Sequence, residues 1–300
     1  GNTSSSYGGG IYSLNPPPPP FTWTFLTNVV VGNKGFTGGG MHVYVQAGNA
    51  WGGVYTSTFA RNIGDGGGLS FRSGSNPVQD NIIYFNSGGA GTPPAHQMRI
   101  NGAAIGFYNN CIEGGMSWDT GTVQWEYTQI NIAGGGQITD NYTGSFATPS
   151  AANNTSGYAG YQSNIPDDPR FYPISEGSGV NFTAPSTMDD SVGGFPNFLA
   201  YKGEIRYSDN SPNWSGSPIG TFINVNSTNN IQHYIIGQFA NNQIVTVLSN
   251  IKTTAGQAYR VYDYHLIGSS PCIGQARAST SPDIEGKVRN DPGDIGAYQY

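Results

Sequence analysis

The chain is poor in charge and in cysteine, and it has no long apolar run. Only 10% of its 300 residues are charged, and its 12 lysines and arginines are scattered singly. Nucleic-acid binding needs clustered basic residues, so we expect no nucleic-acid partner. No stretch reaches the 18 or more apolar residues of a membrane span, so we expect none. The absence of a helical apolar period argues against a helical bundle.

Recognisable catalytic patterns are also missing. The four histidines have no partner at zinc-ligand spacing, and no nucleophile elbow or phosphate loop is present. The carboxylate doublets Asp167-Asp168 and Asp189-Asp190 are the candidates for acid–base work or a Ca²⁺ site. Their Pro and Ser neighbours favour turn formation, so we expect no cofactor, with Ca²⁺ as the exception to consider.

What the chain does have is a repeat. Strand-like runs with Asn at their edges lead into Gly triplets, and Asn28, Ser57, Asn81 and Asn110 follow one another at 29, 24 and 29 residues. Gly and Asn suit turns with positive φ, and stacked Asn side chains can hydrogen-bond from one coil to the next. The expected turn and ladder residues are Asn28, Asn33, Asn62, Asn81, Asn86, Asn110, Gly38, Gly39, Gly40, Gly66, Gly67 and Gly68.

A run of five prolines, Pro16 to Pro20, separates the first repeat unit from the rest. It predicts a stiff polyproline II spacer, because proline has no amide donor for a sheet. Such a spacer would let the first unit reach a neighbouring copy and add a strand to it. Ile11, Tyr12, Pro16 and Pro20 are therefore the candidate subunit contacts.

Four segments resemble secreted bacterial right-handed parallel β-helix proteins of the pectate-lyase-like superfamily. They are the Asn-x-Gly-Gly-Gly-Ile-Tyr type of repeat, Asn110-Cys-Ile-Glu-Gly-Gly115, Ser270-Pro-Cys-Ile273 and Asp294-Ile-Gly-Ala-Tyr298, with Asp283-Ile-Glu-Gly286 between the last two. The resemblance covers roughly 1–146 and 260–300. It departs from the family where Gly274-Gln275-Ala276 replaces the usual Asp-Ala-Gly.

The resemblance implies an all-β, right-handed parallel β-helix with an inserted β- and loop-rich region. We expect a repeat unit at 1–15, the spacer at 16–20, coils at 21–146, an insertion of open fold at 147–259 and a closing segment at 260–300. It also implies secretion, so Cys111 and Cys272 are either a disulfide or two free buried thiols. Seven Asn-x-Ser/Thr sequons and exposed Ser and Thr leave glycans open.

Two functions follow from these expectations. The first is a non-enzymatic structural or adhesive surface protein that assembles end to end as a homopolymer. The alternative is a polysaccharide lyase, glycoside hydrolase or sugar-binding protein, with its site built by 147–259 or by tryptophans that stack on sugars. The scarcity of catalytic residues favours the structural function.

Overall fold

The structure is a computed structural model that contains strands and no helix in its described residues. It divides into two units, residues 1–171 with 265–300, and residues 172–264. The ranges described are 2–14, 23–45, 52–72, 77–88, 97–101, 106–113, 123–126, 130–132, 136–138, 161–162, 164–165, 167–172, 175–183, 188–189, 200–207, 221–224, 232–239, 244–248, 257–277 and 281–300. Across them, no helix is long and apolar enough to cross a membrane.

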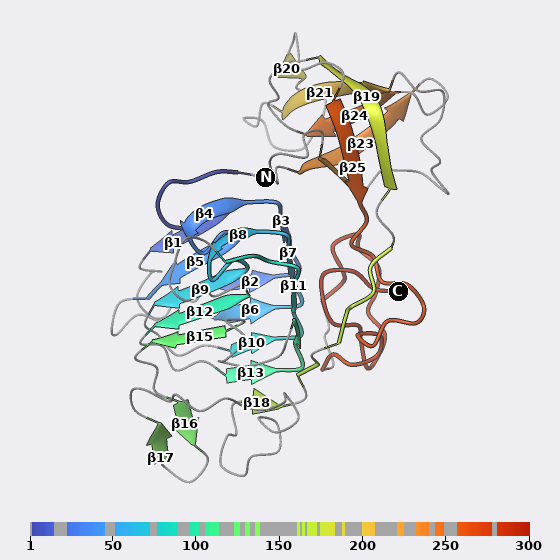
Figure 1. The fold of residues 1–300 in the computed structure, drawn as a ribbon. Helices are drawn as coiled ribbons and strands as arrows, with labels where there is room; N and C mark the ends of the chain where they lie inside the picture. The colour runs from blue at the N-terminus through green and yellow to red at the C-terminus, as the bar shows by residue number, and fades with distance from the viewer. Residues whose placement is uncertain are drawn as a thin grey trace. The chain divides into compact units, whose positions relative to one another are not determined.

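Four parallel sheets make up most of the first unit, and each is named here by its first strand (Figure 1). The β1 sheet contains β1 (Ile11–Leu14), β5 (Met41–Tyr44), β9 (Leu69–Arg72), β12 (Met98–Asn101) and β15 (Val123–Glu126). The β2 sheet contains β2 (Thr24–Leu26), β6 (Gly53–Tyr55), β10 (Pro77–Gln79), β13 (Gly106–Tyr108) and β18 (Tyr161–Gln162). The β3 sheet contains β3 (Val29–Val31), β7 (Thr58–Ala60), β11 (Ile82–Tyr84) and β14 (Cys111–Ile112), and the β4 sheet contains β4 (Lys34–Thr37) and β8 (Ile63–Asp65).

The chain visits these sheets in a fixed order. It runs through β2, β3, β4 and β5, and then repeats the circuit through β6, β7, β8 and β9 one level along. We call one such circuit a coil. Each strand pairs in parallel with its equivalent in the next coil, as Phe25 does with Val54 and Val54 with Val78. The repeat period read from the sequence is therefore the length of one coil.

Ladders of amide side chains line the two bends on either side of the β3 sheet. In one, the backbone N–H of Asn33 donates to Asn62 Oδ1 and that of Asn62 to Asn86 Oδ1, each at 3.0 Å. The ladder then continues to Gln97, whose Oε1 accepts from Asn86 Nδ2 at 2.7 Å. In the other bend, Asn28, Ser57, Asn81, Asn110 and Asn164 follow one another in the same way.

The bends also explain the glycine triplets. Gly38 has φ +66°, a left-handed conformation that strains residues with a Cβ atom. A Cβ atom on Gly39 would overlap the carbonyl oxygen of Ile63 in the next coil. The first glycine therefore makes the turn, and the second allows the coils to approach. An apolar core lies between the sheets, and its fully buried members include Phe59, Leu69, Ile83, Met98 and Ile112.

Residues 265–277 and 281–300, which we call the C-terminal strap, form no strand and lie against the β3 sheet. Alternate residues of a strand point to opposite faces. While Ile83 points into the core, Ile82, Tyr84 and Cys111 form a second apolar cluster with Leu266, Cys272, Ala276 and Ile295 of the strap. The β3 sheet is thus covered on both faces.

The second unit is a separate antiparallel sheet, formed mostly by the region whose fold the sequence left open, and its last strand extends into the expected closing segment at 260–300. Its strand order is β19-β25-β22-β23-β24-β21-β20. The bounds are β19 (Ser175–Thr183), β20 (Met188–Asp189), β21 (Ala200–Tyr207), β22 (Phe222–Asn224), β23 (His233–Phe239), β24 (Ile244–Leu248) and β25 (Gln257–Tyr262). A short antiparallel hairpin, β16 (Ile130–Ile132) with β17 (Gly136–Ile138), belongs to the first unit.

Candidate functional site: an apolar rim on the first coil

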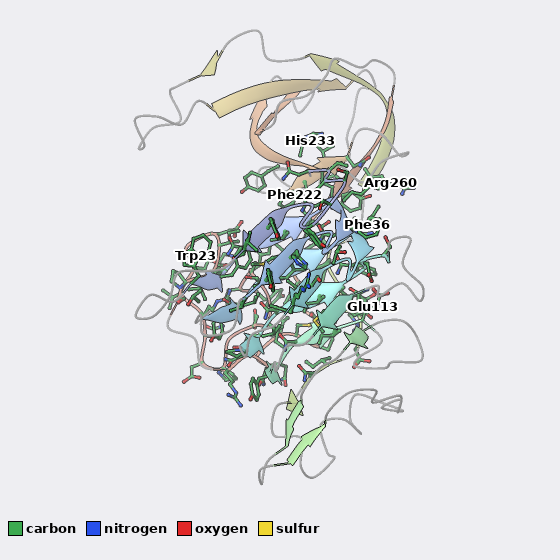
Figure 2. The ribbon with its side chains drawn as sticks, turned by 90° about the vertical axis from the view of Figure 1, so that its left-hand side faces the viewer. Trp23, Phe36, Glu113, Phe222, His233 and Arg260 are labelled. Atoms are coloured by element: carbon green, nitrogen blue, oxygen red, sulfur yellow. The ribbon has the colours of Figure 1, made fainter. Side chains whose placement is uncertain are left out.

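One end of the coil stack carries most of the large exposed apolar side chains among the described residues. We call this set the first-coil rim: Tyr7 (42% exposed), Tyr12 (46%), Leu14 (51%), Trp23 (58%), Leu26 (41%) and Phe36 (61%). The side chain one coil further along from Tyr12 is His42, which is only 3% exposed. Leu14 and Leu26 face outward from their strands, and so do Tyr44 and Tyr55, their equivalents in the next coil, which are partly buried. Figure 2 shows Trp23 and Phe36 on opposite edges of the stack.

Residues 2–14, which we call the arm, cover half of this end. Thr3 and Tyr7 bridge to Lys34 and Thr37 of β4, and β1 pairs with β5. Backbone bonds hold the arm along its whole length, including Lys34 N–H to Asn2 O at 2.8 Å and Ile11 N–H to Gly40 O at 2.9 Å. The arm occupies only the β4 and β1 sheet positions. In the described residues, β2 and β3 therefore have a partner on one side only.

An aromatic stack stands where the arm meets the outer face of the β1 sheet. The rings of Tyr7 and Tyr12 lie 5.8 Å apart and 18° from parallel, and both contact the imidazole of His42. His42 is held from below by a hydrogen bond of 3.0 Å between its Nδ1 and Ser70 Oγ. The two tyrosine rings form a half-exposed apolar platform on a fixed base.

The expected subunit contacts fall partly on this rim. Tyr12 is half-exposed and belongs to the stack, and Ile11 is partly buried beside it in β1. Pro16 and Pro20 lie outside the described residues.

The candidate carboxylates do not form a site in the described residues. Asp167 and Asp168 are exposed, and Asp168 Oδ1 accepts from the backbone N–H of Arg170 at 2.7 Å, which is a turn contact. Asp189 lies in β20 of the second unit, and Asp190 is outside the described residues. Across the described ranges, no group of three or more His, Cys, Asp or Glu residues could hold a metal ion.

No family model, curated protein or solved structure matches the chain. The geometry of the molecule itself must therefore support any function.

The two cysteines meet in the apolar cluster beneath the C-terminal strap. Both are buried and carry free thiols in the structure, and the disulfide stays a prediction. Burial, followed by the neighbouring Cys272, raises the pKa of the Cys111 thiol, whose Sγ donates to Asp167 O at 3.2 Å. A thiol with a raised pKa is a poor nucleophile, so Cys111 acts as a packing group.

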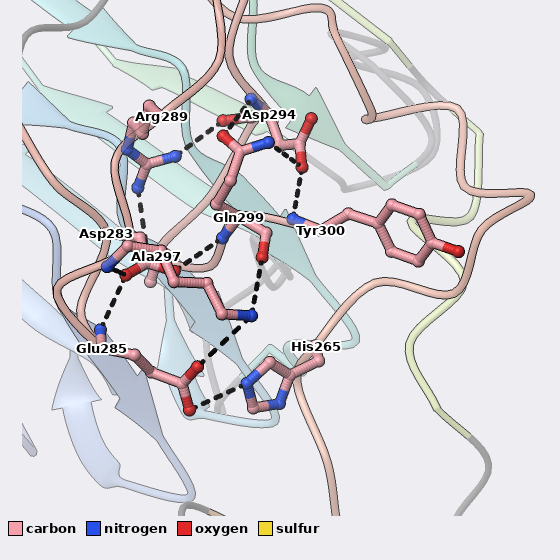
Figure 3. Close-up of polar contacts among 9 residues, drawn as sticks. His265, Asp283, Glu285, Arg289, Asp294, Ala297, Gln299 and Tyr300 are labelled. Carbon is pink, nitrogen blue, oxygen red and sulfur yellow. Dashed lines mark hydrogen bonds and ion pairs between the residues drawn. The ribbon is translucent and has the colours of Figure 1, made fainter.

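The family-like motifs in the strap build a buried polar network (Figure 3). Asp294 Oδ1 accepts from Gly274 N–H, and its Oδ2 accepts from Gln299 Nε2 and Tyr300 N–H at 2.8 and 2.6 Å. Arg289 donates to the carbonyl oxygens of Asp294, Gly296 and Ala297. In this network, Asp294 and Arg289 form hydrogen bonds with other residues of the strap. Both side chains therefore stabilise the conformation of the strap.

Sequence reasoning missed three parts of this arrangement. Gln97 and Asn164 continue the ladders, although neither stands at a spacing of 24 or 29 residues. The signal for Asn164 was the short apolar and amide sequence Tyr161-Gln-Ser-Asn-Ile165, which repeats a strand-and-bend pattern. The gathering of exposed apolar side chains on the first coil depends on how the strands stack, and no residue pattern shows that.

Proposed function

We propose that the protein is a secreted structural component, a right-handed parallel β-helix that assembles end to end into extracellular filaments. The resemblance and the composition, which is low in charge and rich in Gly and Asn, support the secretion. Four parallel sheets visited in a fixed order support the β-helix, and parallel crossovers are right-handed in nearly all proteins.

The first-coil rim is the observation that supports the proposed assembly. Unpaired strand edges are templates for pairing with another chain, and natural proteins normally protect them with charges, prolines or covering segments. On β2 and β3 the described residues provide no such protection on the outer side, and the side chains of these strands are apolar except that of Thr24. Stacking a second copy on this end would bury both the backbone groups and the rim.

The direct test is sedimentation velocity and negative-stain electron microscopy of the full chain over a range of concentrations. We expect filaments with a regular axial repeat for the natural protein. The double variant Leu14→Lys/Leu26→Lys should remain monomeric, because stacking would bury two charges. The matched control is Ile284→Lys/Val288→Lys, which changes two exposed apolar residues of the strap.

The control variant should form filaments as the natural protein does. A natural protein that stays monomeric at every concentration would refute the proposal. A control that also abolishes assembly would show that general surface hydrophobicity, and not the rim, drives the association.

The aromatic stack favours sugar binding as a second candidate function. Parallel, half-exposed tyrosine rings can pack against the apolar face of a pyranose, and Arg72 lies over the Tyr44 ring, 5.1 Å from its centroid, on the same outer face. The strands β1, β5 and β9 carry no carboxylate, and a glycosidase needs two, so we restrict this proposal to binding.

Affinity electrophoresis against a panel of polysaccharides tests this second function. Tyr7→Ala/Tyr12→Ala should lose retardation that the natural protein shows. Tyr300→Ala, which removes an exposed tyrosine of the strap, should keep it. Equal retardation of all three proteins would exclude the stack as the binding platform.

A further inference from the structure

The two cysteines of the chain belong to different parts of the first unit and meet at one point. Cys111 lies in β14 of the coil stack, and Cys272 lies in the C-terminal strap. Both are completely buried in the apolar cluster between the strap and the β3 sheet, where their side chains are in hydrogen-bonding contact. Because the sequence has no third cysteine, each thiol has a single partner within the chain.

One short segment holds both cysteines in place. Cys111 Sγ donates to the carbonyl oxygen of Asp167 at 3.2 Å. Cys272 N–H donates to Ser270 Oγ at 3.1 Å, and that hydroxyl group donates to the carbonyl oxygen of Pro169. A disulfide needs two cysteines whose backbones are held at short distance, and these contacts supply that arrangement.

The strap lies close to the stack around this pair. Gly296 N–H donates to Asp80 O at 2.8 Å, and Ala297 N–H donates to Thr58 Oγ1 at 3.1 Å. A Cβ atom on Gly296 would lie 2.6 Å from Ile82 Cδ1, so the backbone of the strap approaches the sheet at a distance that only glycine allows. In the docked strap, both cysteines are therefore shielded from dissolved molecules.

We propose that Cys111 and Cys272 form a reversible disulfide that holds the C-terminal strap on the β3 sheet. The inference goes beyond the proposed assembly and does not depend on it, because both cysteines lie in the same chain. The bond would close a loop that contains the whole second unit. Reduction would leave the strap attached by its non-covalent contacts alone.

The oxidant is a small disulfide such as oxidised glutathione. One protein thiolate attacks it, forms a mixed disulfide and releases one molecule of glutathione. The second protein thiolate then attacks the protein sulfur of the mixed disulfide and releases the other glutathione. The protein loses two protons and two electrons, and the oxidised glutathione takes them up to become two thiols.

The strap must undock locally before this exchange begins. Burial raises the pKa of the Cys111 thiol and makes it a poor nucleophile, and undocking removes that burial. Local opening of this kind needs less free energy than global unfolding. When the strap docks again, the two sulfur atoms meet and the bond closes within the chain.

Thiol trapping of the full chain tests the bond without any substitution. The natural protein is incubated in buffers with a series of ratios of oxidised to reduced glutathione, quenched with acid, unfolded in urea and alkylated with N-ethylmaleimide. We expect two alkylated thiols in the reducing buffers and none in the oxidising ones, where peptide mapping should join the peptides of Cys111 and Cys272. Two alkylated thiols in every buffer, two glutathione adducts, or a link between two chains would overturn the proposal.

Hydrogen exchange of the same samples tests whether the bond holds the strap. Peptides of the strap should exchange at least about tenfold more slowly in the oxidised protein, because a disulfide restricts the open state. Peptides of β7 and β9 should be unchanged. The control is Cys272→Ala, whose strap should exchange equally in both buffers. Unchanged exchange of the strap in a protein that carries the disulfide would show that the bond does not hold it.

The rate of oxidation tests the need for undocking. Asp294→Ala removes three hydrogen bonds within the strap and should oxidise about tenfold faster than the natural protein. Asp291→Ala, which changes an exposed aspartate of the strap, should oxidise at the natural rate. Equal rates for all three proteins would mean that the thiols react while the strap is docked and would overturn the proposed order of events.

Discussion

The coil stack and the C-terminal strap are both buried and both rich in hydrogen bonds, but they are held in different ways. In the stack, the same amide contact recurs from coil to coil, as Asn33, Asn62 and Asn86 show. In the strap, the polar contacts do not repeat, and a single carboxylate, that of Asp294, accepts from three different donors. Because its contacts repeat, the stack can be extended by a further coil, whereas the polar contacts of the strap are complete within the strap.

This difference indicates where a further copy of the chain can add to the molecule. A ladder ends with a group that is still able to bond, because every member has one neighbour on each side. A self-contained network such as that of Asp283, whose two oxygens accept from Glu285, Lys287 and Gln299, has no such end. Assembly is therefore expected at the ends of the stack and not along the flank that the strap covers.

The largest expected effect comes from breaking a ladder in its middle. Asn62 is fully buried, accepts from Asn33 N–H and Nδ2, and donates to Val30 O and Asn86 Oδ1. Asn62→Ala leaves several buried groups without partners and should lower the free energy of unfolding by about 3 kcal/mol. Urea denaturation followed by circular dichroism measures this loss.

The end of the other ladder supplies the control. Asn28 is only partly buried and its Nδ2 bonds locally to Leu26 O, so Asn28→Ala should cost under about 1 kcal/mol. Equal losses for the two variants would mean that position within a ladder does not matter, contrary to the comparison.

A smaller and local effect is expected in the strap. Asp294→Ala removes the acceptor of Gly274, Gln299 and Tyr300 and should weaken strap docking by about 2 kcal/mol. Hydrogen exchange should accelerate in peptides of the strap and stay unchanged in β7 and β9. The exposed Asp291→Ala is the matched control, and fast exchange throughout the stack would show that the two regions unfold as one.

The repetitive part of this architecture could be predicted from the sequence, because one residue type recurs where one backbone conformation recurs. Asn28, Asn62 and Asn81 stand at bends, and Gly38 has the positive φ that its place before a strand suggested. The spacing therefore predicted parallel, strand-rich coils, and the described strands are parallel in all four of these sheets.

The strap and the rim were beyond such reasoning. The motif ending in Tyr300 indicated a closing segment, but its packing on the outer face of β11 depends on contacts between residues about 200 positions apart, such as Arg277 with Asp80. Likewise, Leu26 is exposed whereas Tyr55, its equivalent in the next coil, is partly buried, and no local pattern distinguishes the two. Tertiary context, and not local propensity, decides both.

The smallest expected effect lies at Asp80, where the two regions meet. Its Oδ1 accepts from Arg277 N–H and its Oδ2 from Gln79 Nε2, and its backbone has φ +59°. Burial raises the pKa of this carboxyl group above 3.8. The protonated carboxyl group therefore contributes its full stabilisation of the folded state below that pH, and this stabilisation is lost as pH rises through the raised pKa.

Asp80→Asn should remove this loss, because the amide is neutral, keeps one acceptor and tolerates positive φ. Thermal melts between pH 4 and pH 7 should show a flatter profile for the variant and a small gain at pH 7. A steeper profile, or a loss of stability at pH 7, would mean that the charge of Asp80 helps to hold the strap against the stack.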